Sequence, residues 1–415
     1  MILISPPLSV FSLAGAGHGL PVEGGGSSGM LVGLAATHAR IHWDAGVPQT
    51  LPKLIQIRTP SQGEFVIEIS SIDGDLVQFA QKSLPTALDL LHSLRKNQHI
   101  DLCASSDVEH STKSTGFSQI QLPVVALPEK NWSDVDVTTA FMGRTFGAPM
   151  LITGMTGGVA QGTQINERLA RAASQFNIPM GVGSQRIALE NPVHAKIFKL
   201  KISFPNLFLI GNIGIGQLQS SEYLDLCRRA VDMIDADALA IHVNALQELI
   251  QVEGDRNFCG IIDKIIKIQE QLGIPVIVKE VGAGMDVGTA VRLAEGGIKY
   301  FDVGGAGGTS WAHIEGLRSS SALIRRRGEV FRDWGIPTAK ALVDLRKALP
   351  DASLVATGGI RDGLIACKAI FLGANMVGLG LPLMRAAVTS DGGPTEILSA
   401  IIDEYKIAKM CSGLA

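Results

Sequence analysis

The sequence has little charge, few aromatic side chains and no marked excess of either sign of charge. Charged residues make up 18% of its 415 residues, aromatic residues make up 5%, and the formal net charge is −3. Disordered chains combine low hydrophobicity with high net charge, whereas 46% of this chain is hydrophobic, so a folded protein is expected. A long basic run, which is the electrostatic signature of a nucleic-acid-binding protein, is also missing. Small molecules are therefore the expected partners.

Cysteine is equally scarce. The five cysteines are odd in number, scattered and never arranged as CxxC: Cys103, Cys227, Cys259, Cys367 and Cys411. Neither a disulfide framework nor a zinc site is expected, and a reducing cytoplasm is the favoured compartment. No apolar run reaches the ~18–20 residues of a membrane span without glycine, proline or charge, and the first residues lack the basic segment of a secretory signal. We therefore expect a cytoplasmic protein without stable membrane association.

The pattern of predicted strands and helices changes near residue 95. Before that point strands and helices do not alternate regularly, and local patterns predict a helix over 31–42, a strand over 65–71 and a second helix over 85–94. GGGSSGMLVGLAA (24–36) is weakly similar to the glycine-serine phosphate loop of the mevalonate kinase-like fold, although the segment is far too short for a kinase. We divide the chain into an N-terminal extension of uncertain fold, 1–94, and a domain that spans 95–415.

From about residue 149, short runs rich in Val, Ile and Leu alternate with helical patterns. Eight such runs are candidate strands: 149–155, 178–184, 207–214, 238–244, 275–282, 300–305, 354–359 and 376–380. Continuous apolar strands that alternate with helices indicate a parallel sheet, and eight such units most economically close into a (β/α)₈ TIM barrel. The sixth and seventh strands are separated by about fifty residues (306–353), so we expect an inserted loop over the mouth of the barrel.

In such a barrel, the active site lies at the C-terminal ends of the strands. GGIR (358–361) follows the seventh strand and GLGL (378–381) follows the eighth, where these barrels build a phosphate site from backbone N–H groups and a helix N-terminus. Glycine lets the backbone approach the anion closely, and a phosphate at this position fits flavin mononucleotide (FMN). Lys279 would then balance the electron density of the reduced ring; alternatively, it forms an ion pair with Glu280 or Asp302.

Basic residues outside these loops suggest a second anion site. RKNQH (95–99) forms a compact cluster, and Arg186 adds a fork-shaped donor after the second strand. The alternative for RKNQH is an ordinary solvated helix end. Glu248 follows the fourth strand, and a carboxylate beside a diphosphate is typical of Mg²⁺ ligands. Glu253 and Asp255 are either additional ligands or exposed acids.

Several segments together closely resemble one known family, type 2 isopentenyl-diphosphate isomerase. They are MTGG (155–158), GVGSQR (181–186), HVNALQELIQVEGDRNF (242–258), PVIVKEVGAGM (275–285), DVGGAGGTSWAHIE (302–315), WGIPTA (334–339) and ATGGIRDG (356–363). RKNQHI (95–100) is similar to the amino-terminal RKxEH signature of that family, and the similarity covers about residues 95–410. Two positions depart from the pattern: Gln98 replaces a glutamate, and Gly304 occupies a position where serine is common.

The resemblance implies an FMN-dependent enzyme that interconverts isopentenyl diphosphate and dimethylallyl diphosphate. It also implies reduction of the flavin by NAD(P)H, acid/base catalysis by reduced FMN, Mg²⁺ bound to the diphosphate, and a homo-oligomer, either a tetramer or an octamer. Glu248 would hold the metal, and His242 and Gln247 would be catalytic. Substrate contacts would come from Arg95, Lys96, His99, Ser184, Gln185, Arg186, Asn244 and Gln247. The FMN site would contain Met155, Thr156, Gly157, Ser184, Asn212, Lys279, Gly304, Thr309, Gly358, Gly359, Ile360, Arg361, Gly380 and Leu381.

The chemistry of an unactivated alkene fits these residue types. Its isomerisation needs protonation of one carbon and deprotonation of another, with a carbocation-like state between them. An electron-rich ring stabilises that charge, and a dry cavity keeps water from trapping it. His242 either orients or relays a proton or is a hydrogen-bonded core histidine, and Trp311 either closes over the hydrocarbon tail or packs within its loop. Two other functions stay open: an FMN-dependent oxidoreductase such as an α-hydroxy-acid oxidase, and a catalytically silent FMN-binding protein.

Overall fold

The computed structural model describes the backbone from Leu84 to Leu414, apart from residue 253, and seven strands between Phe11 and Phe79. Side chains are described from His92 onward, apart from residues 160 and 253. The seven strands form an antiparallel sheet in the order β1-β3-β2-β5-β6-β7-β4. Their bounds are β1 (Phe11–Ser12), β2 (Leu20–Gly24), β3 (Ser27–Leu34), β4 (His38–Trp43), β5 (Leu54–Thr59), β6 (Gly63–Asp73) and β7 (Leu76–Phe79).

This sheet corrects two expectations for the N-terminal extension. The helix predicted over 31–42 is wrong, because β3 pairs with β2 and with β4. Gly29 and Gly33 lie within β3, and each would weaken a helix by about 1 kcal/mol. The similarity to a kinase phosphate loop also fails over residues 27–34, since that segment is a strand and does not open a helix; residues 25, 26, 35 and 36 lie outside the described residues. The strand predicted over 65–71 is confirmed by β6.

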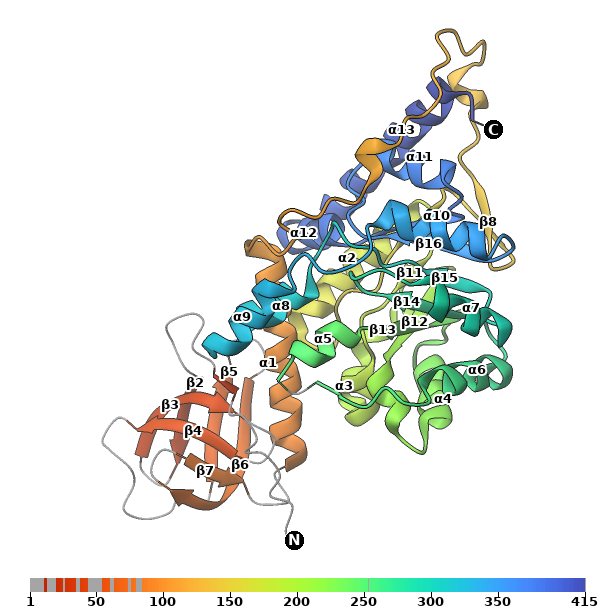
Figure 1. Ribbon diagram of the computed structural model, residues 1–415. Coiled ribbons are helices and arrows are strands. Elements are labelled where there is room, and N and C mark those ends of the chain that lie inside the picture. The colour runs from red at the N-terminus through yellow and green to blue at the C-terminus, as the bar shows by residue number, and fades with distance from the viewer. Residues whose placement is uncertain are drawn as a thin grey trace.

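Helix α1 (Leu84–Ser105) confirms the helix predicted over 85–94 and continues well past residue 95. Figure 1 shows α1 beside the N-terminal sheet and extending to the barrel. Residues 95–99 therefore lie inside a helix rather than at its end, which rules out the solvated helix end considered for RKNQH.

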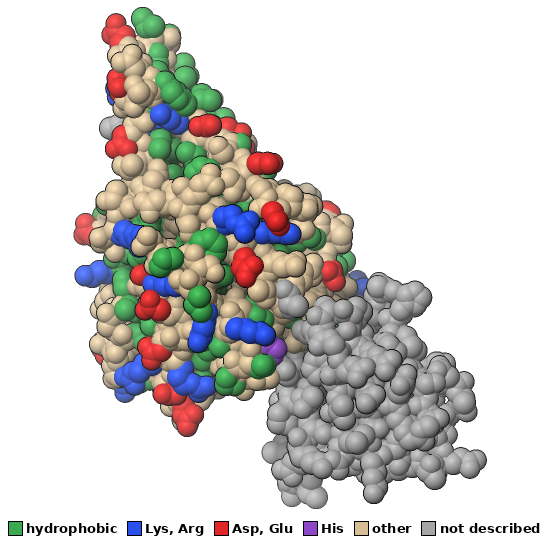
Figure 2. All heavy atoms as spheres, turned by 180° about the vertical axis from the view of Figure 1, so that it is seen from behind, with side chains coloured by type: hydrophobic (Ala, Val, Ile, Leu, Met, Phe, Trp, Pro, Cys, Tyr) green, Lys and Arg blue, Asp and Glu red, His purple; other side chains and the backbone are tan. Residues whose placement is uncertain are grey.

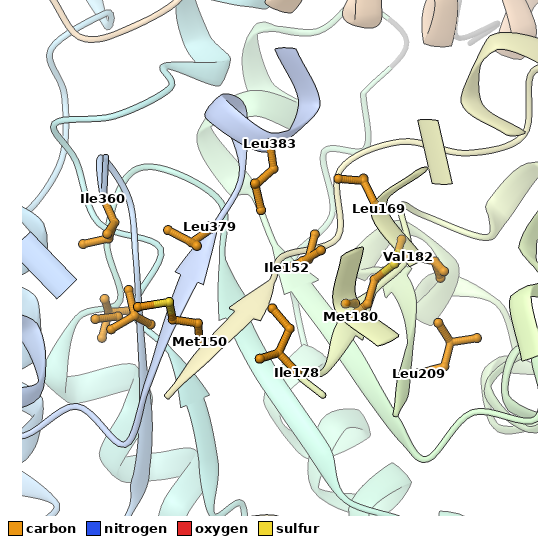
Figure 3. Packing of buried hydrophobic residues seen from close by; sticks show 14 of the residues in the cluster. Met150, Ile152, Leu169, Ile178, Met180, Val182, Leu209, Ile360, Leu379 and Leu383 are labelled. Atoms are coloured by element: carbon orange, nitrogen blue, oxygen red, sulfur yellow. The ribbon is translucent and has the colours of Figure 1, made fainter. Parts of the chain in front are cut away.

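Eight parallel strands form a closed barrel, which confirms the fold and all eight predicted strands. Their bounds are β10 (Met150–Ile152), β11 (Met180–Gly181), β12 (Leu209–Gly214), β13 (Ala238–Val243), β14 (Val276–Glu280), β15 (Tyr300–Asp302), β16 (Ser353–Thr357) and β17 (Met376–Leu379). Outward-facing side chains of β10, such as Met150 and Ile152, pack with Leu169 and Leu383 from the surrounding helices (Figure 3).

Helices surround the barrel (Figure 1). They are α2 (Ala160–Gln175), α3 (Arg186–Glu190), α4 (Tyr223–Ile234), α5 (Ala245–Ile250), α6 (Ile261–Leu272), α7 (Val287–Glu295), α8 (Trp311–Arg318), α9 (Ala322–Val330), α10 (Thr338–Ala348), α11 (Gly363–Phe371), α12 (Leu381–Thr389) and α13 (Gly393–Ser412). Short 3₁₀ turns are η2 (Phe117–Gln119), η3 (Trp132–Asp134), η4 (Pro192–Phe198), η5 (Leu200–Ile202) and η6 (Ile215–Gln219). Among the described residues, none of these helices has both the length and the apolar character of a membrane span. Figure 2 shows acidic and basic side chains interspersed on one face of the barrel domain.

The long connection between β15 and β16 carries two extra helices, α8 and α9, before α10. The two helices approach closely because glycine faces glycine: a Cβ on Gly328 would lie 2.6 Å from the Cα of Gly316. Trp311, the first residue of α8, lines the cavity at the mouth of the barrel. The insertion expected over the mouth is therefore a helical pair.

The inside of the barrel is apolar at one end and polar at the other. A hairpin of β8 (Thr139–Phe141) and β9 (Arg144–Phe146) brings Phe141 and Phe146 into a buried cluster with the first inward-facing residues of the strands. Those strand residues are Leu151, Ile210, Ala238, Ala240, Ile277, Val355 and Met376. Further along the same strands, polar residues follow: His242, Lys279 and Asp302 are paired in register, and Asn212 and Thr357 lie two residues after Ile210 and Val355. The functional site is expected at this polar end.

Candidate active site

One cavity opens at the C-terminal ends of the barrel strands, and α1, α5 and α8 contribute to its wall. Most of the residues predicted from the sequence line it. They are Arg95, Lys96, His99, Met155, Thr156, Ser184, Arg186, Asn212, His242, Asn244, Gln247, Glu248, Lys279, Gly304, Thr309, Gly358, Gly359, Ile360, Arg361, Gly380 and Leu381. Residues more than 280 positions apart in the sequence therefore meet in one site.

Two predicted site residues do not line this cavity. The side chain of Gln185 is fully buried behind it, where its amide bonds to Ala230 O at 2.8 Å and to Asn212 N at 2.9 Å. Gly157 lies against the ring of Phe198, which leaves no room for a Cβ. The structure therefore does not support a direct substrate contact from the Gln185 side chain, nor a place for Gly157 on the cavity wall.

Glycine loops after β15 and β16 form a tight cradle on one side of the cavity. Gly358 and Gly359 have φ values of +117° and +72°, which favour glycine, and a Cβ on Gly358 would clash with Gly305 O. Gly380 immediately precedes α12, so the N-terminus of this nine-residue helix adjoins the cavity. Arg361 lines the cavity and pairs with Glu109. Backbone N–H groups, a helix N-terminus and an arginine together fit the phosphate of FMN.

Lys279 lies at the end of β14 and is 8% exposed. Its ammonium donates to Glu280 O at 3.2 Å, and within the described residues it makes no ion pair. The Glu280 carboxylate is engaged elsewhere, because the N–H groups of residues 281–284 donate to it at 2.5–3.0 Å. Burial raises the pKa of Asp302, and the charge of Lys279 opposes that shift. The ion pairs considered from the sequence do not form, and Lys279 stays available to a ligand such as a reduced flavin.

A second set of cations lines the cavity between α1 and α3. Lys96 donates to Ser184 O at 3.0 Å, and burial, together with the charges of Arg95 and Arg186, lowers its pKa to about 7. Arg186 bonds to Glu190 at 2.8 Å. Arg95, Lys96 and Arg186 together offer several hydrogen-bond donors at this wall, which suits an anion with more than one charge, and the carboxylates of Glu190, Glu248 and Asp255 act on Arg186.

Glu190 and His92 anchor this basic cluster. The Glu190 carboxylate accepts from His92 at 2.9 Å as well as from Arg186. Burial alone would raise the pKa of Glu190, but His92 and Arg186 together lower it to about 2. Glu190 therefore stays ionised and holds the guanidinium of Arg186 in place at the edge of the cavity.

Oxygen atoms beside the basic cluster could hold a metal ion. Glu248 accepts from Asn244 Nδ2 at 2.8 Å and from Asp255 N at 2.9 Å, and burial raises its pKa. Asn244 is 3% exposed, and its Oδ1 has no hydrogen-bond partner among the residues that the structure describes. A carboxylate and an orphaned carbonyl oxygen are ligands that Mg²⁺ prefers. Within the described residues no three His, Cys, Asp or Glu side chains form a metal cluster, so further ligands would come from substrate or water. Glu253 lies outside the described residues.

Comparison with known proteins shows the family to which this chain belongs. A model of the FMN-dependent dehydrogenase family matches residues 230–415. The isopentenyl-diphosphate delta-isomerase of Nostoc sp. is 42% identical over 321 residues, which cover 77% of this chain and 92% of the relative. The Xanthobacter autotrophicus protein of the same name is 44% identical over 322 residues, which cover 77% and 94%. The chain belongs to the isopentenyl-diphosphate delta-isomerase family.

Solved structures support the fold alone. One crystal structure of mandelate oxidase has a TM-score of 0.51 and 18% identity, and the match covers 76% of this chain and 90% of that one. Another has a TM-score of 0.52 and 19% identity, with coverage of 79% and 93%. Both matches show that the barrel fold is shared with mandelate oxidase.

The structure explains one departure from the isomerase family pattern. Gly304 has a φ of +47°, and a Cβ there would clash with the backbone of Glu280. Here glycine is required by the close approach of two loops. The other departure, Gln98, accepts from Arg318 Nε at 3.4 Å, so this neutral side chain still contacts a buried cation.

Glu315 is a site residue that the sequence reasoning left without a role. It is 2% exposed, accepts from Gln247 Nε2 at 2.9 Å and from His99 Nε2 at 3.0 Å, and pairs with Arg318. Burial alone would raise its pKa, but Arg318 and His99 hold the pKa below its usual range. One feature of the sequence could have indicated Glu315. It lies three residues before Arg318 on α8, which is the spacing of a helical ion pair, and one turn after Trp311.

His242 is both a hydrogen-bonded histidine and a cavity residue. Its Nδ1 lies 2.8 Å from Asn212 Oδ1. Burial and the charges of Lys279 and Lys96 lower its pKa to about 3. Trp311 likewise lines the cavity, and its ring packs edge-on against the ring of His99, with 5.2 Å between the ring centroids.

Proposed function

We propose that this protein interconverts isopentenyl diphosphate and dimethylallyl diphosphate in the cavity at the mouth of its barrel. The observation that carries the proposal is the presence of two separate anion sites on one cavity. The glycine cradle after β15, β16 and β17 fits the phosphate of FMN, and the basic cluster between α1 and α3 fits a diphosphate. The names of the 42–44% identical relatives support the same substrates.

The basic cluster would bind the diphosphate. Arg95, Lys96 and Arg186 supply its charge and hydrogen bonds, with Ser184 beside them. Glu248 and the free Oδ1 of Asn244 would hold Mg²⁺ against the diphosphate oxygens. These contacts fix one end of the substrate, so the hydrocarbon end extends toward the centre of the barrel.

The glycine cradle, Arg361 and Lys279 would hold FMN. Bound reduced FMN supplies an electron-rich ring that stabilises positive charge on the alkene and exchanges protons with it. Lys279 would stabilise the anionic edge of the ring, because its ammonium reaches the cavity without an ion pair among the described residues.

Side chains from α1, α5 and α8 would position the alkene and exclude water. Glu315 receives hydrogen bonds from His99 and Gln247, so both point in fixed directions. Trp311 packs on His99 and covers this side of the cavity. A dry, rigid wall keeps water away from a carbocation-like state. Gln247 would orient or relay a proton from this position.

Deuterium exchange tests the proposal. The protein is loaded with FMN, reduced with NAD(P)H, and incubated with Mg²⁺ and isopentenyl diphosphate in D₂O. NMR should show deuterium in the substrate and formation of the dimethylallyl isomer. If the protein is shown to hold reduced FMN and gives neither result, the proposal is wrong. The protein would then be a catalytically silent FMN-binding protein.

A second function has specific support and a separate test. The match to the FMN-dependent dehydrogenase family and the mandelate oxidase-like barrel would also suit an α-hydroxy-acid oxidase. Such an enzyme would reduce its flavin with a hydroxy acid under anaerobic conditions, which bleaches the absorbance of oxidised flavin. Bleaching by mandelate or lactate, without deuterium exchange, would favour the oxidase.

Three further features belong to the proposal. They are the use of NAD(P)H as reductant, assembly into a homo-oligomer, and a cytoplasmic location. All five cysteines are free, as expected in a reducing compartment. Flavin reduction by each nicotinamide, light scattering and cell fractionation test the three features in turn.

A further inference from the structure

A chain of buried hydrogen bonds lies behind His242. It runs from the backbone of α4 through Gln185 and Asn212 to the imidazole ring. Gln185 is 0% exposed and Asn212 is 4% exposed, so water does not compete for these bonds. The direction of each bond can be read from its partners, and together they decide which ring nitrogen of His242 carries the proton.

The orientation of Gln185 is fixed at both ends by backbone groups. Its Nε2 lies 2.8 Å from Ala230 O, which only accepts, and its Oε1 lies 2.9 Å from Asn212 N, which only donates. Exchange of the amide oxygen and nitrogen would create two repulsive contacts in a buried site. The Gln185 amide therefore has one orientation.

Gln185 takes the place of a missing strand partner. Strand β11 ends at Gly181, and its last pairing with β12 is at Ile210. Beyond that point the backbone N–H of Gln185 donates to Asn212 O at 2.9 Å, while its side chain accepts from Asn212 N. One glutamine thus holds both main-chain groups of Asn212 where the ladder has ended.

The side chain of Asn212 is oriented in the same way. Its Nδ2 donates to Val182 O at 2.9 Å, so its Oδ1 faces His242 Nδ1 at 2.8 Å. Because a carboxamide oxygen only accepts, the proton of this hydrogen bond must lie on Nδ1.

We infer that Gln185 and Asn212 are positioning residues that hold His242 as its Nδ1–H tautomer, with the lone pair of Nε2 at the cavity. The Nε2 edge of the ring lies against Gly214, where a Cβ would come within 2.5 Å of this nitrogen, and both residues line the cavity. In a neutral imidazole only one nitrogen carries a proton, so a proton on Nδ1 leaves Nε2 as the acceptor.

This tautomer limits what His242 can do in the proposed reaction, and that consequence rests on the proposed function. Nε2 accepts a hydrogen bond from a ligand but has no proton to give. His242 therefore orients a donor group in the cavity, and the proton that reaches the alkene comes from another group.

Nitrogen-15 NMR of the imidazole rings tests the tautomer in the full-length, FMN-loaded protein. Two-bond ¹⁵N–¹H spectra at neutral pH distinguish a protonated from an unprotonated ring nitrogen, and His242→Gln assigns the signal by its disappearance. We expect Nδ1 protonated and Nε2 unprotonated. A protonated Nε2, or averaged shifts from two tautomers, would overturn the inference. The readout needs no isomerase activity, so its failure is distinguishable from failure of the proposed function.

Paired substitutions test the positioning residues. Gln185→Met removes both amide bonds and should produce a mixture of His242 tautomers, whereas Gln185→Glu keeps the acceptor for Asn212 N and should restore much of the single signal. Asn212→Leu removes the partner of Nδ1 and should abolish the Nδ1–H preference. Asn166→Leu alters another buried amide, on α2, and should leave the spectrum unchanged. A folded Gln185→Met protein with the wild-type His242 signal would contradict the role of Gln185. If Gln185→Met does not fold, Asn212→Leu and the wild-type spectrum decide.

Discussion

The two ends of the barrel interior are built by the same strands but lined by different side chains. At the end closed by the β8–β9 hairpin, the inward positions are aliphatic and pack against Phe141 and Phe146. One or two inward positions further along, the strands present Asn212, His242 and Lys279. The apolar end stabilises the fold, and the polar end carries buried polar groups whose desolvation cost is offset by hydrogen bonds.

The comparison teaches that stability and function are separated along each strand rather than between domains. Substitutions at the apolar end should change the free energy of unfolding without changing ligand binding. Substitutions at the polar end should do the reverse. Four experiments test this separation, from the largest expected effect to the smallest.

The largest effect is expected at the apolar end. Phe146 is 1% exposed, so Phe146→Ala should lower the free energy of unfolding by about 3–5 kcal/mol because it leaves a cavity. Urea titration measures the loss. Phe371→Ala, at a ring that is 44% exposed, is the control and should change stability by less than about 0.5 kcal/mol. Loss of FMN affinity in a folded Phe146→Ala protein would show that the two ends are coupled.

At the polar end, Glu248→Gln should lower kcat/KM by about 10²–10³-fold, because the proposed metal at the diphosphate would lose its charged ligand. Unfolding and the spectrum of bound flavin should stay unchanged. Glu270→Gln makes the same chemical change at an exposed site on α6 and should be fully active. If flavin is lost from the Glu248 variant, the proposed metal role is wrong.

Filling the glycine cradle should weaken FMN binding. A Cβ on Gly380 would lie 3.1 Å from Thr153 and project at the cavity, so Gly380→Ala should cost about 1–3 kcal/mol of FMN affinity. Fluorescence titration of FMN measures it. Gly392→Ala is the matched control, since its nearest new neighbour is Glu396 at 3.5 Å. Equal FMN affinities for the two variants would contradict the assignment of the cradle.

The smallest effect concerns pH. Lys96 has a pKa of about 7 in the free protein, and a bound diphosphate would raise that pKa. As the pH rises above 7, free Lys96 loses its charge, so diphosphate affinity should fall by up to about tenfold per pH unit. Lys96→Arg keeps its charge and should flatten the profile above pH 7. Calorimetric titration with diphosphate at several pH values measures this. The same dependence of affinity on pH in the wild type and in Lys96→Arg would refute the account.

Much of the fold was predictable because its signals are local. Each barrel strand is a continuous apolar run that ends in glycine or a polar residue, and all eight were located from that pattern. The helix predicted over 31–42 failed because strand pairing between β3, β2 and β4 overrode an apolar run that also fits a helix.

Site residues were predictable where they belong to one short sequence motif. They were not predictable where their role depends on contacts between residues far apart in the sequence. The glycine loops and the basic cluster were recognisable in the sequence, and both line the cavity. Glu315 was missed because its partners His99 and Gln247 lie 216 and 68 residues away. Gln185 was expected to touch substrate, but its side chain turns away toward Ala230 and Asn212.

By itself, the sequence determined the strand positions, the glycine-lined mouth and the residue types available for two anion sites. These follow from hydrophobic periodicity and from the chemistry of single side chains, which neighbours in sequence define. Only the tertiary structure decided which residues share the cavity, that Lys279 makes no ion pair among the described residues, and that His242 Nδ1 faces Asn212. Closure of the barrel brings groups from distant parts of the chain within hydrogen-bond distance, and only at that distance are orientation, burial and pKa set.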